Sequence, residues 1–230
     1  MLHKETVSPA TLELLKTLMN DPLFSGFFLV GGTALSLQIG HRKSIDLDLF
    51  SLDDFNENEL QAHIEEKYNF YTDFQSKNTL KGQINGVKVD FISHKYPLIN
   101  PLLIEEDVRM AGLDDIAAMK LNAISGNGTR LKDFIDIAYL SSFLTPIQIV
   151  EAYQAKYSSR NPLMAIKSMV YHQDIDFTEP IEMMDQKYSW KQVEKRLNNM
   201  LDTPDRLFDS LILTKEVEKK EESKRKGICK

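Results

Sequence analysis

The chain has 230 residues, of which 42% are apolar, so it can bury one good core or a catalytic domain with a smaller helical one. No window approaches the roughly eighteen consecutive apolar residues of a membrane span, the N-terminus lacks the order of a secretion signal, and the single cysteine, Cys229, excludes a disulfide framework. We therefore expect a cytoplasmic protein without redox chemistry, and the net charge of -6 argues against broad non-specific binding to nucleic acid.

The first elements alternate between helix and strand. Ser8-Pro9 provides an N-cap and a first-turn proline for an amphipathic helix. The apolar run Phe27 to Val30 is typical of a buried strand, and it stops at Gly31-Gly32. A short helix over residues 34–39 is expected to end at Gly40. The predicted order is strand, glycine turn, helix.

The next segment alternates as a half-buried strand does. From Ile45 to Phe50, apolar and polar residues follow one another with a period of two. We expect Ile45, Leu47 and Leu49 on one face. The opposite face then carries Asp46, Asp48 and Phe50.

A helix and a hairpin follow. Residues 57–68 look helical, and residues 79–84 pair with 87–92 across Asn85-Gly86, a strong signal for a two-residue turn. This hairpin places Asp90 inside a strand.

From Asp114 onward the sequence predicts helices and no strand, followed by a charged tail from about Lys215. The fold class is therefore α+β, with a small mixed sheet in residues 1–110 and a helical region in residues 111–230. The expected helices cover residues 114–125, 129–143, 146–157, 162–172, 190–200 and 205 to about 219.

Three carboxylates suggest a metal site. Asp46 and Asp48, two positions apart on a strand, project to the same side and can share divalent cations. Asp90 lies in an otherwise apolar strand, where its charge needs a partner. Hard oxygen ligands favour Mg²⁺ or Mn²⁺. The rival interpretation, a calcium loop, fails because Phe50 and Ser51 stand where a ligand and a glycine are required.

The glycine turn suits phosphate binding. Gly31 and Gly32 at the start of a helix offer backbone donors without side-chain obstruction, and Thr33 adds a hydroxyl. A glycine pair alone more often makes only a turn. Its position upstream of Asp46 and Asp48 strengthens the functional interpretation.

These motifs resemble those of the DNA polymerase beta superfamily of nucleotidyltransferases, and more narrowly the abortive-infection toxins of the AbiEii/AbiGii family. The resemblance covers about Phe27 to Leu140. Its motifs are GGTAL, HRKSIDLDLF, VKVDFI, AAMKLNAI and RLKDFIDIAYL.

The resemblance implies roles for individual residues. Gly31, Gly32 and Thr33 would hold the triphosphate, and Asp46, Asp48 and Asp90 would bind metal, with Asp90 also a candidate base. Lys120 would neutralise phosphate charge or touch the acceptor, and Asp133 or Asp136 would complete the helical side. Arg42 and Ser44 would assist nucleotide binding, whereas the histidines have no expected role. A surface charge network remains the alternative for residues 130–136.

The resemblance further implies a metal-dependent enzyme that moves a nucleotide from a nucleoside triphosphate to an acceptor, releasing pyrophosphate. It suggests a bacterial toxin paired with an antitoxin and acting on RNA such as transfer RNA. Lys187, Lys191, Lys195 and Arg196 are the clustered basic residues that could contact RNA. The alternatives are a small-molecule or protein acceptor, and a non-catalytic member that binds nucleotide or a partner.

Overall fold

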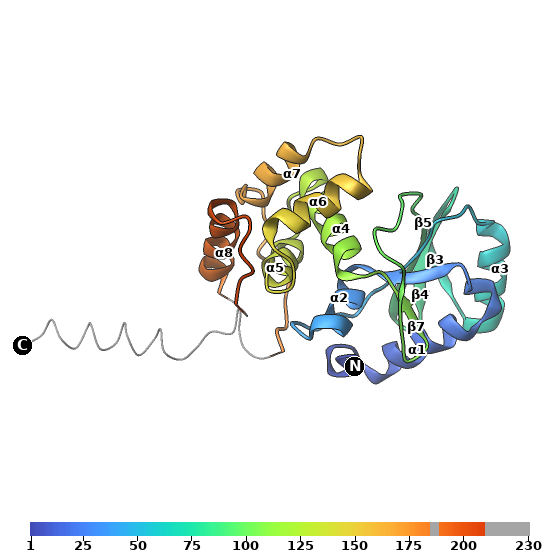
Figure 1. Ribbon diagram of the computed structural model, residues 1–230. Coiled ribbons are helices and arrows are strands. Elements are labelled where there is room, and N and C mark those ends of the chain that lie inside the picture. The colour runs from blue at the N-terminus through green and yellow to red at the C-terminus, as the bar shows by residue number, and fades with distance from the viewer. Residues whose placement is uncertain (185–188, 210–230) are drawn as a thin grey trace, which may run out of the picture.

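A mixed sheet and a group of helices make up the two halves of the computed structural model, which describes residues 1–184 and 189–209 (Figure 1). The sheet has seven strands in the order β3-β4-β5-β2-β1-β7-β6. The strands are β1 (Phe27–Val30), β2 (Leu47–Ser51), β3 (Tyr71–Ser76), β4 (Thr79–Ile84), β5 (Val87–Ser93), β6 (Leu103–Glu105) and β7 (Val108–Met110).

Helices α1 (Pro9–Asn20), α2 (Gly31–Ile39) and α3 (Glu57–Tyr68) belong to the sheet half of the molecule. The other half follows β7 and consists of helices that pack on one another (Figure 1). These are α4 (Leu113–Gly126), α5 (Leu131–Leu140), α6 (Pro146–Lys156), α7 (Pro162–Met169) and α8 (Trp190–Asp202). The predicted α+β class is confirmed. In the part of the chain that is described, every helix is too short or too polar to cross a membrane.

The centre of the sheet explains where polar groups can collect. β2 runs antiparallel to β1 and parallel to β5. Leu47 and Leu49 are fully buried on one face of β2, and on β5 the ring of Phe91 stacks 5.3 Å from that of Phe24. Leu47, Leu49 and Phe91 thus face one core, and Asp48 and Asp90 project to the opposite side.

The predicted hairpin is confirmed, with Asn85 and Gly86 both at positive φ (50° and 81°) between β4 and β5. Gly40 ends α2 as predicted. The prediction for Ile45 is wrong, because β2 begins only at Leu47 and leaves Ile45 70% exposed.

Three strands were not predicted. β3 is an edge strand whose side chains are mostly exposed, so its sequence does not alternate, and β6 and β7 span three residues each, too few for a period. The helix predicted from Asp205 is absent over residues 205–209, and its remainder lies outside the described residues.

A buried ion pair ties the helical half to the loop after β5. Lys156 at the end of α6 donates to Asp115 of α4 (2.7 Å) and to the carbonyl of Pro97 (2.9 Å). Asp115 also accepts from the backbone of Ile99 (3.1 Å). Beside this pair, His94 packs between the rings of Phe50 (5.3 Å) and Tyr96 (4.8 Å).

Acid should weaken the fold through His94. Burial lowers the pKa of His94 to about 4 from an ordinary value of 6.5, with a further contribution from the charge of Lys156. The unfolded chain therefore binds a proton that the folded chain rejects, so the free energy of unfolding should fall as pH drops from about 6.5 to about 4. Urea titrations at pH 7 and pH 5 should show a smaller loss in His94→Gln than in the wild type. Equal losses in the two proteins would contradict this assignment.

Candidate active site

Two aspartates lie side by side at the centre of the sheet. β2 and β5 are parallel and place Asp48 directly opposite Asp90. Residues paired in this way project to the same face. Asp46 precedes β2 by one residue. The structure thus brings the three predicted carboxylates to one region of the sheet.

The charge of Asp48 is unfavourable in the folded protein. Burial raises its pKa above the ordinary value, and the negative charges of Asp90 and Asp46 raise it further, against the opposing charge of Lys120. Among the described residues, no hydrogen bond or ion pair reaches the carboxylate of either Asp46 or Asp48. Both groups are therefore available to a ligand.

The glycine turn presses directly against Asp48. Gly31 has φ +71°, and a Cβ built there would overlap Oδ2 of Asp48. A Cβ on Gly32 would come within 2.6 Å of Nη2 of Arg42. Only glycine suits the first position, for both its conformation and its close contact. The first backbone N–H groups of α2 accordingly lie next to the carboxylates.

Thr33 connects this turn to Asp46. Its hydroxyl donates to the carbonyl of Asp46 and lies 2.8 Å from the hydroxyl of Ser44. Thr33 is fully buried, so its hydroxyl holds the chain before β2 in place. Contact of Thr33 and Ser44 with a triphosphate stays a prediction.

Asp136 on α5 is the centre of a buried charge network. Arg42 donates to it through Nε (2.7 Å) and Nη2 (2.8 Å), a two-pronged pair, and His41 lies 2.8 Å from it through Nε2. Lys120 of α4 forms a third contact with Asp136, an ion pair of 2.7 Å between Nζ and Oδ2. Burial alone would raise the pKa of Asp136, but Arg42 and Lys120 hold it well below the ordinary value.

Lys120 also binds Asp133, at 2.7 Å. Burial disfavours its charge, but Asp133 and Asp136 together raise its pKa above the ordinary value. Both aspartates of the helical motif therefore pair with Lys120, and Asp136 adds the link to Arg42. In this arrangement the Lys120 ammonium is shared between two carboxylates, so its contact with phosphate or acceptor stays a prediction.

Two residues near the site escaped the sequence analysis. Lys81 on β4 donates to Asp90 (2.7 Å), and its position opposite Asp90 in the hairpin register was the signal that could have shown this. Burial lowers the pKa of His41, so the neutral ring donates from Nε2 to the Asp136 carboxylate. A histidine with no expected role thus belongs to the network.

The carboxylates have the donor chemistry of a divalent-cation site. Asp46 and Asp48 offer hard oxygen atoms, and a cation would offset the burial and the repulsion that raise the pKa of Asp48. Within the described residues, no three acidic, histidine or cysteine side chains converge tightly enough to hold one ion. Asp90 is engaged by Lys81 here. The metal assignment therefore stays a prediction that the donor set supports.

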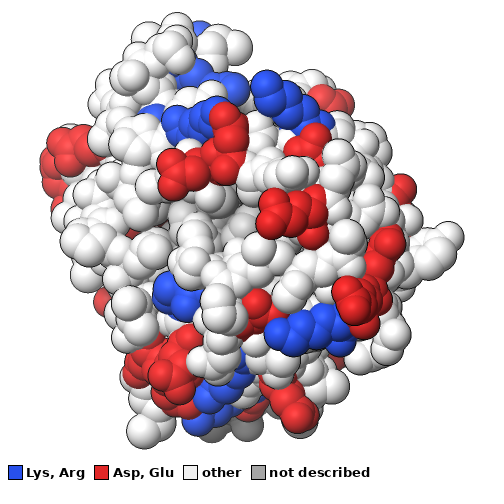
Figure 2. Space-filling view, turned by 90° about the vertical axis from the view of Figure 1, so that its right-hand side faces the viewer, with Lys and Arg blue, Asp and Glu red and all other residues white. Residues whose placement is uncertain are grey.

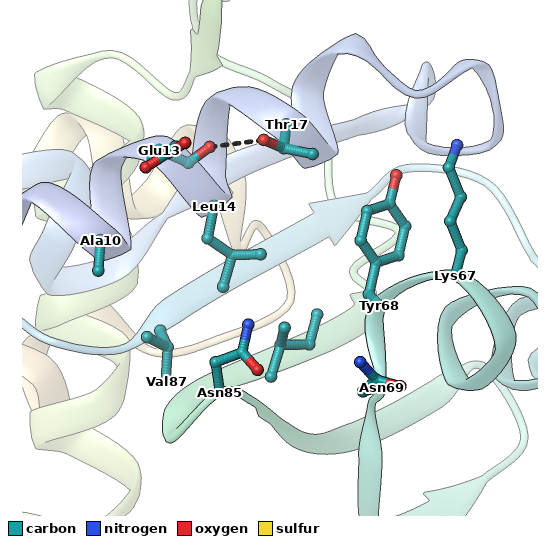
Figure 3. Close-up of a pocket in the computed structure, with 10 residues that line it drawn as sticks. Ala10, Glu13, Leu14, Thr17, Lys67, Tyr68, Asn69, Asn85 and Val87 are labelled. Carbon is teal, nitrogen blue, oxygen red and sulfur yellow. Dashed lines mark hydrogen bonds between the residues drawn. The ribbon is translucent and has the colours of Figure 1, made fainter.

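Two hollows have the size of a ligand site. One, of about 600 Å³, is lined by residues 42–46, Lys132 and residues 179–183, so it opens beside Asp46. The other, of about 410 Å³, lies between α1, the end of α3 and the β4–β5 turn (Figure 3). None of the predicted site residues lines this second hollow, and Lys67 and Tyr68 at its edge are bonded to Asp21. The first hollow is the one that adjoins the candidate active site.

Comparison with known proteins gives a family, a relative and a fold. The family model described as "Nucleotidyl transferase AbiEii toxin, Type IV TA system" matches residues 13–212. An uncharacterized protein of Aquifex aeolicus (strain VF5) is 30% identical over 191 residues, covering 80% of this chain and 90% of that protein. The crystal structure of JHP933 from Helicobacter pylori has a TM-score of 0.52 at 16% identity and covers 95% of this chain and 98% of that chain, a likeness of fold.

Removing Lys120 should strongly destabilise the protein. Lys120→Met leaves two buried carboxylates without their shared partner, which costs about 3–5 kcal/mol of unfolding free energy. Urea denaturation measures this loss. Lys95→Met is the matched control, because Lys95 pairs with Asp54 (2.6 Å) where both side chains are more than half exposed, and it should change stability little. Equal stability of the two variants would show that the network is not a structural core.

Proposed function

The chain belongs to the AbiEii family of nucleotidyl transferases, and we propose that it transfers a nucleoside monophosphate from a nucleoside triphosphate to a hydroxyl of RNA, with Mg²⁺ or Mn²⁺. In this proposal the protein is the toxin of a toxin–antitoxin pair. Acting on cellular RNA, it would work in the cytoplasm.

One observation carries the proposal: the start of α2 abuts the carboxylate of Asp48. Backbone N–H groups at a helix start attract phosphate oxygens, and carboxylates attract the cations that accompany a triphosphate. The closeness of Gly31 to Asp48 allows one triphosphate to meet both features. Binding and chemistry would then occur at the same place beside the central strands of the sheet.

The reaction is a displacement at the α-phosphorus. The acceptor hydroxyl oxygen forms a bond to that phosphorus, the bond to the bridging oxygen breaks, and pyrophosphate leaves. Asp90 would take the hydroxyl proton, provided that the acceptor reaches it in place of Lys81. The start of α2 would hold the phosphates. Arg42, held in place by Asp136, lies close to Gly32 and would help to fix the position of this turn.

Asp46 and Asp48, with Asp90, would hold the divalent cation. A cation bound there stabilises the negative charge that builds on the phosphate oxygens. The raised pKa of Asp48 supports this role, because a carboxylate whose charge is costly in the folded protein gains most from a cation.

The predicted basic cluster gives limited support to an RNA acceptor. Lys191 and Lys195 are exposed on α8, whereas Lys187 lies outside the described residues. Arg196 is turned inward, donating to the Ser141 hydroxyl (3.1 Å) and the carbonyl of Asp209 (2.7 Å). On the side where α3 lies, acidic and basic side chains are interspersed (Figure 2). The RNA acceptor thus rests mainly on the family.

The proposal of a cognate antitoxin is also supported by the family description. The description of the matching family includes a type IV toxin–antitoxin system, and from it we propose that an antitoxin opposes this enzyme.

Asp48→Asn tests the proposal. The purified protein is incubated with each α-labelled nucleoside triphosphate, Mg²⁺ and total RNA, and label on RNA and released pyrophosphate are measured. The variant should lose roughly 100-fold or more of the activity, because the charge that engages the cation is gone. Its melting temperature should equal or exceed that of the wild type, because burial and neighbouring charges make the Asp48 charge unfavourable in the fold.

Asp53→Asn is the control, since Asp53 is exposed just beyond β2. It should transfer like the wild type. Normal transfer by Asp48→Asn would refute the assigned site. Pyrophosphate without labelled RNA would redirect the acceptor to a protein or small molecule, and neither product from the wild type would favour a protein that only binds nucleotide.

A further inference from the structure

The hollow beside Asp46 has the size and the apolar lining of a ligand site. Its volume of about 600 Å³ falls within the roughly 300–1,000 Å³ of small-molecule sites. Its apolar lining comes from both sides of the opening. These residues are Ile45, Pro180, Ile181 and Met183.

Ile45 is the most unusual of them. It continues the alternation of Leu47 and Leu49, yet it is 70% exposed, whereas those two leucines are fully buried. An isoleucine left in water beside a catalytic carboxylate loses the stabilisation that burial would give it. A ligand that covers Ile45 would restore that stabilisation.

The opposite wall is fixed in position. Residues 182–184 pair antiparallel with residues 41–43 through one bridge, with Arg42 opposite Met183. The backbone of Lys43 donates to the carbonyl of Glu182 (2.7 Å), and that of Met184 donates to the carbonyl of His41 (3.1 Å). The width of the hollow is therefore set by backbone hydrogen bonds to the same connection that carries Ile45 and Asp46.

Polar groups at the rim match a nucleoside in character. Lys132 and Glu179 form an ion pair (2.7 Å) and present both donors and acceptors. Lys43 is exposed at the same opening. Apolar walls with a few polar groups at the rim are the usual composition of a small-molecule site, and here they would suit the face of a base, its polar edge and a phosphate near Lys43.

We propose that this hollow receives the terminal nucleoside of the RNA acceptor, with its base against Ile45 and Ile181 and its hydroxyl directed to the carboxylates. This assignment rests on the proposed function. The hollow begins at Arg42 and Ser44, which lie against Gly32, and extends past Asp46 to Lys132 and residues 179–183. A triphosphate held at the start of α2 would occupy the Gly32 end, so we assign the remainder, on the far side of Asp46, to the acceptor.

Ile45→Ala tests the proposal through the separate KM values for total transfer RNA and for the nucleoside triphosphate. The KM for transfer RNA should rise on the order of tenfold, with the KM for the triphosphate and the melting temperature unchanged. Ile104→Ala is the matched control, because Ile104 is 67% exposed on β6, and it should change neither constant. A rise confined to the triphosphate KM would overturn the assignment in favour of the incoming base, and no change in either KM would overturn it altogether.

Filter binding of total transfer RNA without triphosphate separates this inference from the proposed function. If Ile45→Ala binds transfer RNA more weakly than the wild type does, the hollow is supported as an acceptor site even when no transfer is detected. Equal affinities would overturn the inference, whereas a silent transfer assay by itself counts only against the proposed reaction.

Discussion

The buried carboxylate of Asp136 is the constraint on which the rest of the structure depends. It is fully buried on α5 and receives Arg42 from the sheet half and Lys120 from α4. A buried charge is tolerated only when partners surround it, so these three side chains must stay together. Nη2 of Arg42 lies close to Gly32, and Asp48 lies close to Gly31. The network therefore fixes the position of the helical half relative to the glycine turn and to Asp48.

This arrangement separates structural charges from available ones. Asp133 and Asp136 share Lys120 inside the protein, whereas the carboxylates of Asp46 and Asp48 have no hydrogen-bonding partner among the described residues. The buried network gains stability from its internal pairing, and Asp48, whose pKa is raised, carries a charge that opposes folding. Such an unfavourable charge is expected where a ligand is to be bound.

The sequence indicated the elements whose side chains repeat regularly. The apolar run before Gly31, the alternation around Asp48 and the Asn85-Gly86 turn each express a local preference that needs no distant contact. The partners of these residues depend on the register between strands and on the packing of helices. The pairing of Lys81 with Asp90 follows from the register of the predicted hairpin, whereas His41 against Asp136 joins distant segments and could not be assigned from local pattern. Ile45 kept its strand pattern although the strand starts after it.

The central claim, that a triphosphate binds beside the central strands of the sheet, between the start of α2 and the carboxylates, is tested most directly by a crystal structure with Mn²⁺ and a non-hydrolysable nucleoside triphosphate. The account predicts phosphate oxygens on the backbone N–H groups of Gly31 and Gly32, Mn²⁺ on Asp46 and Asp48, and Asp90 separated from Lys81. Triphosphate bound elsewhere, or Mn²⁺ absent from Asp48 at saturating concentration, would contradict it.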